Sequence, residues 1–267
     1  MKRNVLLIEP NYKNKYPPIG LMKLATYHKM LGDNVVFFKG ELKDFLIKNI
    51  SELCVEKFEK IDKSINWKSR SLLVQEYIRK RNKTIIDNLK LSDSKYEILL
   101  LNALNYFKDF YWKKEYLNEK YWDRICITTL FTFYWDITIK TIELCKDLVK
   151  NENEIWVGGV MASVIPNEIR KQTGLKNIHS GLLNKSGILD KNEIVIDELP
   201  LDYSILEEID YKYPENNAYY GYTTRGCVRK CEFCAVPIIE PKFIPKIELT
   251  TKIKGVDEIY GTKRNLL

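Results

Sequence analysis

Short apolar segments separated by helical patterns make up most of the chain outside one long internal segment. Asn4–Ile8 is a continuous apolar run, the pattern of a strand that is covered on both faces. From Ile19 to Leu31 apolar residues recur at helical spacing, and Gly32 follows where a left-handed helix cap belongs. Four further strands are predicted, over Val35–Phe38, Arg124–Leu130, Glu154–Val157 and Asn177–Ser180. Two further helices are predicted, over Asp136–Lys150 and Pro166–Gln172.

This alternation of strands and helices predicts an α/β protein. Strand–helix–strand units with short connections favour a parallel sheet flanked by helices. Five such strands fit a flavodoxin-like, doubly wound domain over residues 1–182. Ligands of these sheets bind outside the carboxyl ends of the strands. We therefore expect a ligand site among Pro10–Gly20, Thr129–Tyr134 and the pair Gly158 and Gly159.

Residues 41–123 interrupt this pattern. The segment has no glycine or proline, is rich in charged and aromatic residues, and is predicted to be a helical insertion of about three helices. The aromatics between Tyr106 and Trp122 are interleaved with lysines, as in surfaces that stack single-stranded bases. The same composition is typical of helices that pack their rings in a core and keep their lysines in water. We favour the second interpretation and do not expect nucleic acid as a partner.

Composition and charge limit the class of protein without indicating its chemistry. Hydrophobic residues make up 45% and charged residues 30%, which indicates a globular chain and excludes a disordered or collagen-like one. The net charge of +7 over 267 residues is too mild to indicate nucleic-acid binding. The first apolar run ends at Glu9, too early for a signal peptide or a membrane span. We expect a cytoplasmic protein with reduced cysteines and no membrane partner.

Three of the six cysteines, Cys227, Cys231 and Cys234, fall within eight residues. Three thiolates at this spacing can ligate a 4Fe–4S cluster and leave one iron without a protein ligand. An open iron suits a cluster that binds a substrate rather than one that only carries electrons. Gly226 would let the backbone turn closely against the cluster. The alternative is a structural zinc site, but it needs a fourth ligand, and both histidines lie in the other predicted domain.

The segment that contains these cysteines, YTTRGCVRKCEFC, resembles the signature loop of radical S-adenosylmethionine (radical SAM) enzymes. The resemblance implies that Cys227, Cys231 and Cys234 ligate a 4Fe–4S cluster whose open iron chelates S-adenosylmethionine. It implies an electron donor such as flavodoxin or ferredoxin, and reductive cleavage to methionine and a 5′-deoxyadenosyl radical that abstracts hydrogen from a substrate. Phe233 occupies the aromatic position, whose backbone lies near the adenine in that family.

The N-terminal domain resembles that of the cobalamin-binding-domain subgroup of the same superfamily. Pro17–Leu21 matches its typical start of the first helix, and Gly158 and Gly159 match the glycine pair after the fourth strand. The resemblance makes these two glycines candidate cofactor-binding residues. The cobalamin motif DxHxxG is absent from the sequence. Cobalamin therefore stands beside a second interpretation, in which the domain has lost the cofactor or uses its cleft for substrate.

A second branch of the superfamily, the methylthiotransferases, is also similar in one feature. Those enzymes often carry a Val-Pro-type pair after the third cysteine, and Ala235–Pro237 matches it. They also carry a second cysteine triad in the N-terminal domain. The sequence contexts of Cys54, Cys126 and Cys145 do not resemble that triad. We therefore rank this branch lower and read Cys126 and Cys145 as small buried side chains.

Residues 183–217 are predicted to be a linker, and residues 218–267 the first part of an incomplete radical SAM (β/α) barrel. The chain after Tyr220 is far shorter than the roughly 180 residues that six βα units require. We expect a first strand, the cysteine loop, one helix and a second strand near Arg264. Three interpretations stay open: a truncated product, an enzyme whose barrel a second polypeptide completes, and a non-catalytic binding module. An unfinished sheet also predicts poor order or association beyond about residue 236.

Overall fold

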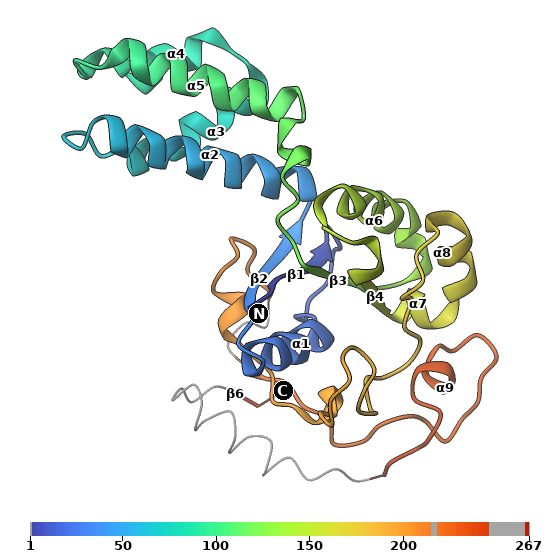
Figure 1. Cartoon of the computed structure of the whole chain (residues 1–267). Coiled ribbons are helices and arrows are strands. Elements are labelled where there is room, and N and C mark those ends of the chain that lie inside the picture. The colour runs from blue at the N-terminus through green and yellow to red at the C-terminus, as the bar shows by residue number, and fades with distance from the viewer. Residues whose placement is uncertain (1, 215–217, 246–264, 267) are drawn as a thin grey trace. The chain divides into compact units, whose positions relative to one another are not determined.

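The computed structural model describes residues 2–214, 218–245 and 265–266 (Figure 1). By its internal contacts the chain divides into two compact units. The first contains residues 1–40 and 121–267, and the second contains residues 41–120. The first unit carries the predicted ligand edge and the cysteines of the signature loop.

The first unit is built on a parallel sheet. Among the described residues this sheet has four strands in the order β2-β1-β3-β4: β1 (Asn4–Pro10), β2 (Asn34–Gly40), β3 (Arg124–Thr129) and β4 (Ile155–Gly159). The order matches the start of the doubly wound order 2-1-3-4-5. Val5 pairs with both Val35 and Arg124, so β1 lies at the centre of the sheet. The α/β class and the parallel sheet are therefore confirmed.

Helices cover both faces of the sheet, which explains the continuous apolar runs in its strands. The four helices are α1 (Ile19–Met30), α6 (Trp135–Leu148), α7 (Val160–Val164) and α8 (Pro166–Thr173). Figure 1 shows α1 on one face and α6 with α8 on the other. Val5, Leu6, Leu7 and Ile8 are consequently all fully buried. The predicted cap of α1 is also confirmed, because Gly32 has a φ of 79° and its N–H donates to Lys29 O.

The predicted fifth strand is wrong. In the described part of the chain, Asn177–Ser180 forms a single bridge between Ile178 and Val157 rather than a strand. Its backbone then leaves the sheet, because the Ser180 hydroxyl donates to Ser163 O at 3.0 Å and the Gly181 N–H donates to Ser163 Oγ at 2.9 Å. These bonds turn the chain toward α7 after one bridge, so the ladder cannot extend.

The segment expected to be a linker contributes to the core of the first unit. It holds only two short 3₁₀ turns among its described residues, η6 (Ile196–Glu198) and η7 (Ser204–Leu206). It nevertheless buries Ile196, Tyr203, Ile205 and Tyr213 in the same cluster as residues of α1 and β2. Residues 183–214 therefore pack as an irregular layer, which leaves no hydrophobic period in the sequence.

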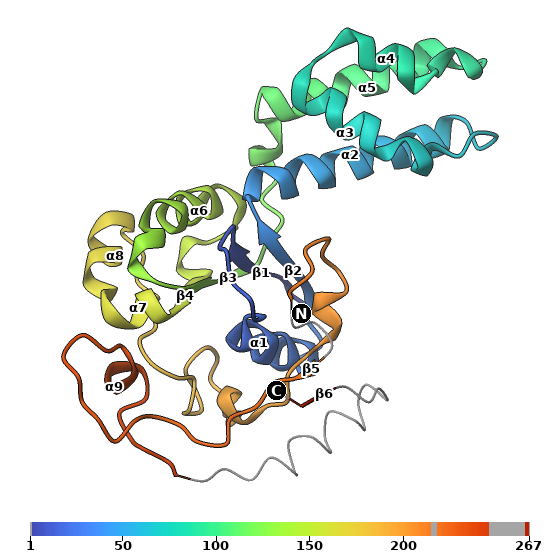
Figure 2. The ribbon, with the colours of Figure 1, turned by 180° about the vertical axis from the view of Figure 1, so that it is seen from behind.

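The last described elements contain the cysteine loop. β5 (Ala218–Tyr219) pairs in parallel with β6 (Asn265–Leu266) (Figure 2). β6 begins one residue after Arg264, where the second strand of the barrel was predicted. The short helix α9 (Val236–Ile239) lies between them in sequence. The expectation of poor order beyond residue 236 falls mainly on residues 246–264, which lie outside the described residues.

The second unit is helical. Within residues 41–120 there are four α-helices rather than about three: α2 (Leu42–Ile61), α3 (Ser71–Lys80), α4 (Lys83–Leu89) and α5 (Glu97–Trp112). The short 3₁₀ turns η1 (Trp67–Arg70), η2 (Leu91–Asp93) and η3 (Glu115–Asn118) complete it. The extra break arises because Arg81 adopts a left-handed φ of 55° and Asn82 then caps α4 by accepting from Thr84 N. Phe107, Phe110 and Tyr111 pack against the core of this unit, as the core interpretation predicted.

Among the described residues, no helix combines the length and the apolar character that crossing a membrane requires.

Candidate ligand cleft and cysteine loop

A cleft of about 380 Å³ lies at the carboxyl edge of the sheet, where the strand order predicted a ligand site. Its walls come from the start of α1, the ends of β3 and β4, the 179–197 segment and the base of the cysteine loop. Both predicted glycines, Gly158 and Gly159, line it. The Thr129–Tyr134 turn contributes only its first two residues, and the Pro10–Gly20 loop contributes its last four.

The two glycines have different physical roles. Gly159 has a φ of 101°, and a Cβ placed on it would lie 2.3 Å from Thr129 O. It therefore lets the ends of β3 and β4 approach closely, which is a structural requirement. A Cβ on Gly158 would meet no heavy atom within 4 Å in the described part of the chain. Gly158 leaves open space in the cleft.

A chain of alternating charges joins the cleft to the cysteine loop. Lys23 of α1 donates to Asp197 Oδ1 at 2.7 Å, and the Arg225 guanidinium contacts the other oxygen of the same carboxylate. Arg225 Nε also donates to Glu240 Oε1 at 2.9 Å. Although burial opposes it, the hydrogen bond from Lys23 and the pairing with Arg225 hold the pKa of Asp197 below its usual range. This network could not be predicted from the sequence, because its members are far apart along the chain.

The base of the cysteine loop is closed by backbone and side-chain bonds. Arg225 and Ile244 exchange two backbone hydrogen bonds, of 3.1 and 2.8 Å. The Gly226 N–H donates to Glu240 Oε2 at 2.6 Å. Gly226 has a φ of 69°, and a Cβ on it would lie 2.4 Å from Lys242 O, so only glycine fits this turn. Residues 227–243 thus form a loop with a fixed base.

The loop presents its cysteines to solvent. Cys227 is exposed and Cys231 and Cys234 are half-buried, while Phe233 is 93% exposed. The Cys234 N–H donates to Cys231 O at 3.0 Å, which makes a tight turn between these two thiols. Within residues 2–214 and 218–245, no three Cys, His, Asp or Glu side chains converge as a metal site. The loop would therefore have to close around a metal to bring its thiols together.

The other three cysteines are chemically different. Cys54, Cys126 and Cys145 are buried in α2, β3 and α6, and burial raises the pKa of each thiol, that of Cys126 to about 12. A thiol that stays protonated is a poor metal ligand and nucleophile.

The two histidines of the chain have hydrogen-bond partners away from the cysteine loop. His28 Nδ1 lies 2.8 Å from Asp33 Oδ2, and His179 Nε2 lies 3.1 Å from Leu182 O.

A second buried polar cluster was not predicted. Glu9 and Lys39, at the ends of β1 and β2, form an ion pair of 3.2 Å, and the Tyr213 hydroxyl donates to Glu9. Lys39 Nζ also donates to Asn14 Oδ1 at 2.6 Å. Burial raises the pKa of Glu9, against the effect of Lys39. The sequence feature that could have predicted this cluster is a charged residue directly after each of two apolar runs, Glu9 after Asn4–Ile8 and Lys39 after Val35–Phe38. The cluster fixes the loop after β1.

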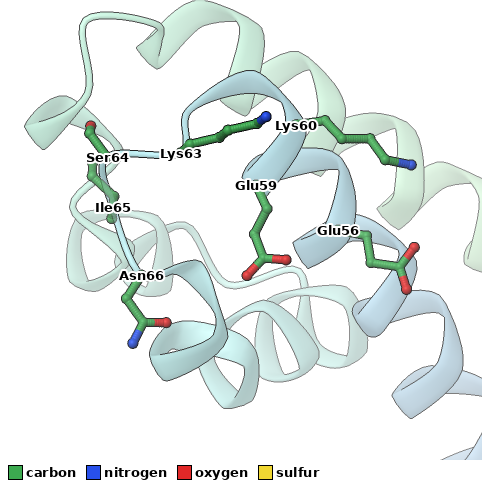
Figure 3. Close-up of a pocket in the computed structure, with 7 residues that line it drawn as sticks. All are labelled: Glu56, Glu59, Lys60, Lys63, Ser64, Ile65 and Asn66. Carbon is green, nitrogen blue, oxygen red and sulfur yellow. The ribbon is translucent and has the colours of Figure 1, made fainter.

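The second unit has a larger but shallower pocket, of about 640 Å³ (Figure 3). It is lined by the end of α2 and the turn after it, through Glu56, Glu59, Lys60, Lys63, Ser64, Ile65 and Asn66. Most of these side chains are solvent-exposed, and the pocket offers no enclosed apolar wall among its lining residues. Its open, charged lining therefore does not favour a ligand site.

Comparisons with known proteins add little. No protein-family model matches the chain, and no curated protein matches it. Among solved structures it is similar to the radical S-adenosylmethionine methyltransferase TsrM from Kitasatospora setae, whose structure contains cobalamin and a [4Fe-4S] cluster. The TM-score is 0.40 and the identity 13% over 97% of this chain. The match spans 46% of the TsrM chain.

Proposed function

We propose that this chain is a radical SAM protein that holds a 4Fe–4S cluster through Cys227, Cys231 and Cys234. The observation that carries the proposal is the contrast between its two sets of cysteines. Three thiols share one solvent-accessible loop with a fixed base, and the other three are buried singly with raised pKa values. Thiolate character and access are what metal ligation requires.

The surroundings of the loop support the same assignment. Arg229 and Lys230 are exposed between the cysteines, and their charges would offset those of thiolates and sulfides. The Arg229 N–H already lies 3.4 Å from Cys227 Sγ, the kind of backbone bond that stabilises a ligating thiolate. Gly226 gives the turn that starts the loop. When bound, such a cluster would supply the electron that cleaves S-adenosylmethionine to methionine and a 5′-deoxyadenosyl radical.

Two further roles belong to the proposal. The exposed Phe233 would offer its backbone to the adenine of S-adenosylmethionine, as the resemblance implies. A flavodoxin or ferredoxin would deliver the electron.

Cobalamin is not part of the proposal. The cleft at the sheet edge has about 380 Å³, near the lower end of the roughly 300–1,000 Å³ typical of pockets for drug-sized ligands. A corrin with its side chains is larger than such ligands. The enclosed part of the cleft is therefore smaller than the whole cofactor. The methylthiotransferase branch is not favoured either, because within the described residues Cys54, Cys126 and Cys145 do not gather as a metal site.

The test is anaerobic reconstitution of the chain with iron and sulfide. We expect about four iron atoms per chain and the electron paramagnetic resonance signal of a reduced 4Fe–4S cluster. Cys231→Ala should lose both, while the matched control Cys145→Ala should retain them. Zinc in place of iron, or full iron content in Cys231→Ala, would overturn the ligand assignment. Formation of 5′-deoxyadenosine from added S-adenosylmethionine and dithionite would support catalysis, and a loaded cluster without cleavage would favour the non-catalytic module.

A further inference from the structure

The cleft at the sheet edge has mostly apolar walls. Aliphatic side chains enclose it from several parts of the first unit, among them Ile19, Leu130, Val157, Leu182, Leu189 and Ile239. A pocket of this kind gains binding energy by removing apolar ligand surface from water.

The charged groups of the cleft are already paired with one another. Lys23 and Arg225 both contact Asp197, and Arg225 also contacts Glu240. Two cations and two carboxylates give this network a formal charge of zero. Their side chains are between 9% and 18% exposed, so an added charge would be poorly solvated there. A charged ligand group would also have to break one of these ion pairs. The network therefore disfavours both anions and cations.

The cleft also touches the cysteine loop. Tyr222 and Arg225 line the cleft, and Arg225 lies directly before Gly226 and Cys227. The Arg225 guanidinium lies 4.7 Å from the Tyr222 ring centroid, so the two side chains form one wall. A ligand in the cleft would contact the fixed base of the loop.

We propose that this cleft is a binding site for an uncharged, largely apolar small molecule. Gly158 and Gly20 leave space for a ligand in the cleft, since a Cβ on either would meet no heavy atom within 4 Å among the described residues. That this molecule is the compound on which the cysteine loop acts rests on the proposed function, whereas its binding does not.

A pair of fluorescent probes tests the ligand class. N-phenyl-1-naphthylamine is neutral and apolar, and 8-anilinonaphthalene-1-sulfonate carries the same rings with one sulfonate. We expect the full chain, without a cluster, to bind one equivalent of the neutral probe and to bind the sulfonate at least about tenfold more weakly. Equal or tighter binding of the sulfonate would overturn the assignment.

Two variants test the place of binding. Gly158→Phe fills the cleft from β4, and Gly20→Trp fills it from the first turn of α1, so one remains informative if the other misfolds by circular dichroism. Each variant should weaken the binding of the neutral probe by at least about tenfold. Ile98→Ser, which changes a 75% exposed side chain of the second unit, should leave binding unchanged. Unchanged binding in a folded cleft variant, or loss in Ile98→Ser, would refute the site.

The outcomes separate this inference from the proposed function. Probe binding that Gly158→Phe abolishes, in a chain that takes up no iron, would support the cleft and refute the cluster. A cluster that loads in a chain with no cleft-dependent probe binding would support the cluster and refute the cleft.

Discussion

His28 is a buried ionisable side chain of α1 whose surroundings lower its pKa. Its side chain is fully buried, and Nδ1 lies 2.8 Å from Asp33 Oδ2, so Nδ1 carries the hydrogen that the carboxylate accepts. Arg3 also binds Asp33, at 2.7 Å, and the charges of Arg3 and Arg124 oppose a positive charge on His28. Burial is the main cause that lowers the pKa of His28 from 6.5 to about 4, against the hydrogen bond to Asp33. The imidazole is therefore neutral in the folded protein at neutral pH.

This pKa predicts a loss of stability in mild acid. Between about pH 6.5 and pH 4 the unfolded chain binds a proton at His28 that the folded chain does not, so the free energy of unfolding falls as the pH falls. The expected loss from His28 is about 2 kcal/mol between about pH 7.5 and pH 5. Denaturant unfolding of the wild type and of His28→Gln at both pH values measures it. The variant should show the smaller decrease, and equal decreases in the two proteins would contradict the assignment.

Single residues stand out in the sequence where one property decides their role. The three cysteines of the loop were singled out by spacing alone, the structure gives them access to solvent, and their role as metal ligands stays a prediction. Gly159 was expected to bind a cofactor, but its φ and its approach to Thr129 explain it structurally. Lys39 and Glu9 each directly follow an apolar run, and this signal was missed; their partner Tyr213 is far away in sequence and meets them only in the folded chain.

At the scale of elements, the cysteine loop depends on one carboxylate at its base. Glu240 accepts from the Gly226 N–H at 2.6 Å and from Arg225 Nε at 2.9 Å. Its side chain is 18% exposed, so both bonds are partly shielded from water. Hydrogen bonds to charged groups contribute about 1.5–3 kcal/mol each.

Removing Glu240 should therefore open the loop more often. Glu240→Ala is expected to raise the rate of tryptic cleavage after Arg229 or Lys230 by at least about tenfold, because the loss of even one bond of about 1.5 kcal/mol raises the open population about tenfold. Time courses of limited proteolysis, read by mass spectrometry, measure this rate. The matched control is Glu232→Ala, which removes an exposed carboxylate of the same loop. Similar rates in both variants would show that Glu240 does not hold the base.

The elements of the sheet were predictable because their signal is local. Four apolar runs became strands, since a strand buried on both faces must be apolar throughout. Asn177–Ser180 has only one apolar residue, Ile178, and the bonds to Ser163 divert it from the sheet after one bridge. The helices of the second unit were miscounted because Arg81 and Lys90 take left-handed conformations that usually favour glycine. Residues 183–214 gave no signal because an irregular layer has no period.

At the scale of the whole molecule, the two units have separate hydrophobic cores. The core of the second unit is formed by residues from α2 to α5, including Phe58, Trp67 and Leu100, all of them fully buried. The ligand cleft lies entirely within the first unit. Its charge network joins α1 to residues near the end of the described chain, a proximity that no local pattern could reveal. The second unit is therefore the part whose independence can be tested alone.

We expect residues 41–120, expressed alone, to fold cooperatively. α3 and α4 are too short to be stable as isolated helices, so helical circular dichroism with a sigmoidal thermal transition would require the packed core. A single core of this size supplies about 3–5 kcal/mol. Trp67 is fully buried, lies 5.1 Å from the Phe58 ring and donates from Nε1 to Asp62 O at 2.9 Å.

Trp67→Ala is then the decisive variant of this fragment. Truncating a buried tryptophan costs about 3–5 kcal/mol, as much as the whole core supplies, so the fragment should lose its transition. Leu72→Ala, at a 76% exposed position of α3, should leave the midpoint nearly unchanged. A cooperative transition in Trp67→Ala would show that the core does not depend on this residue. Absence of a transition in the unmutated fragment would show that the second unit needs the rest of the chain, because its own helices would then be insufficient to bury one another.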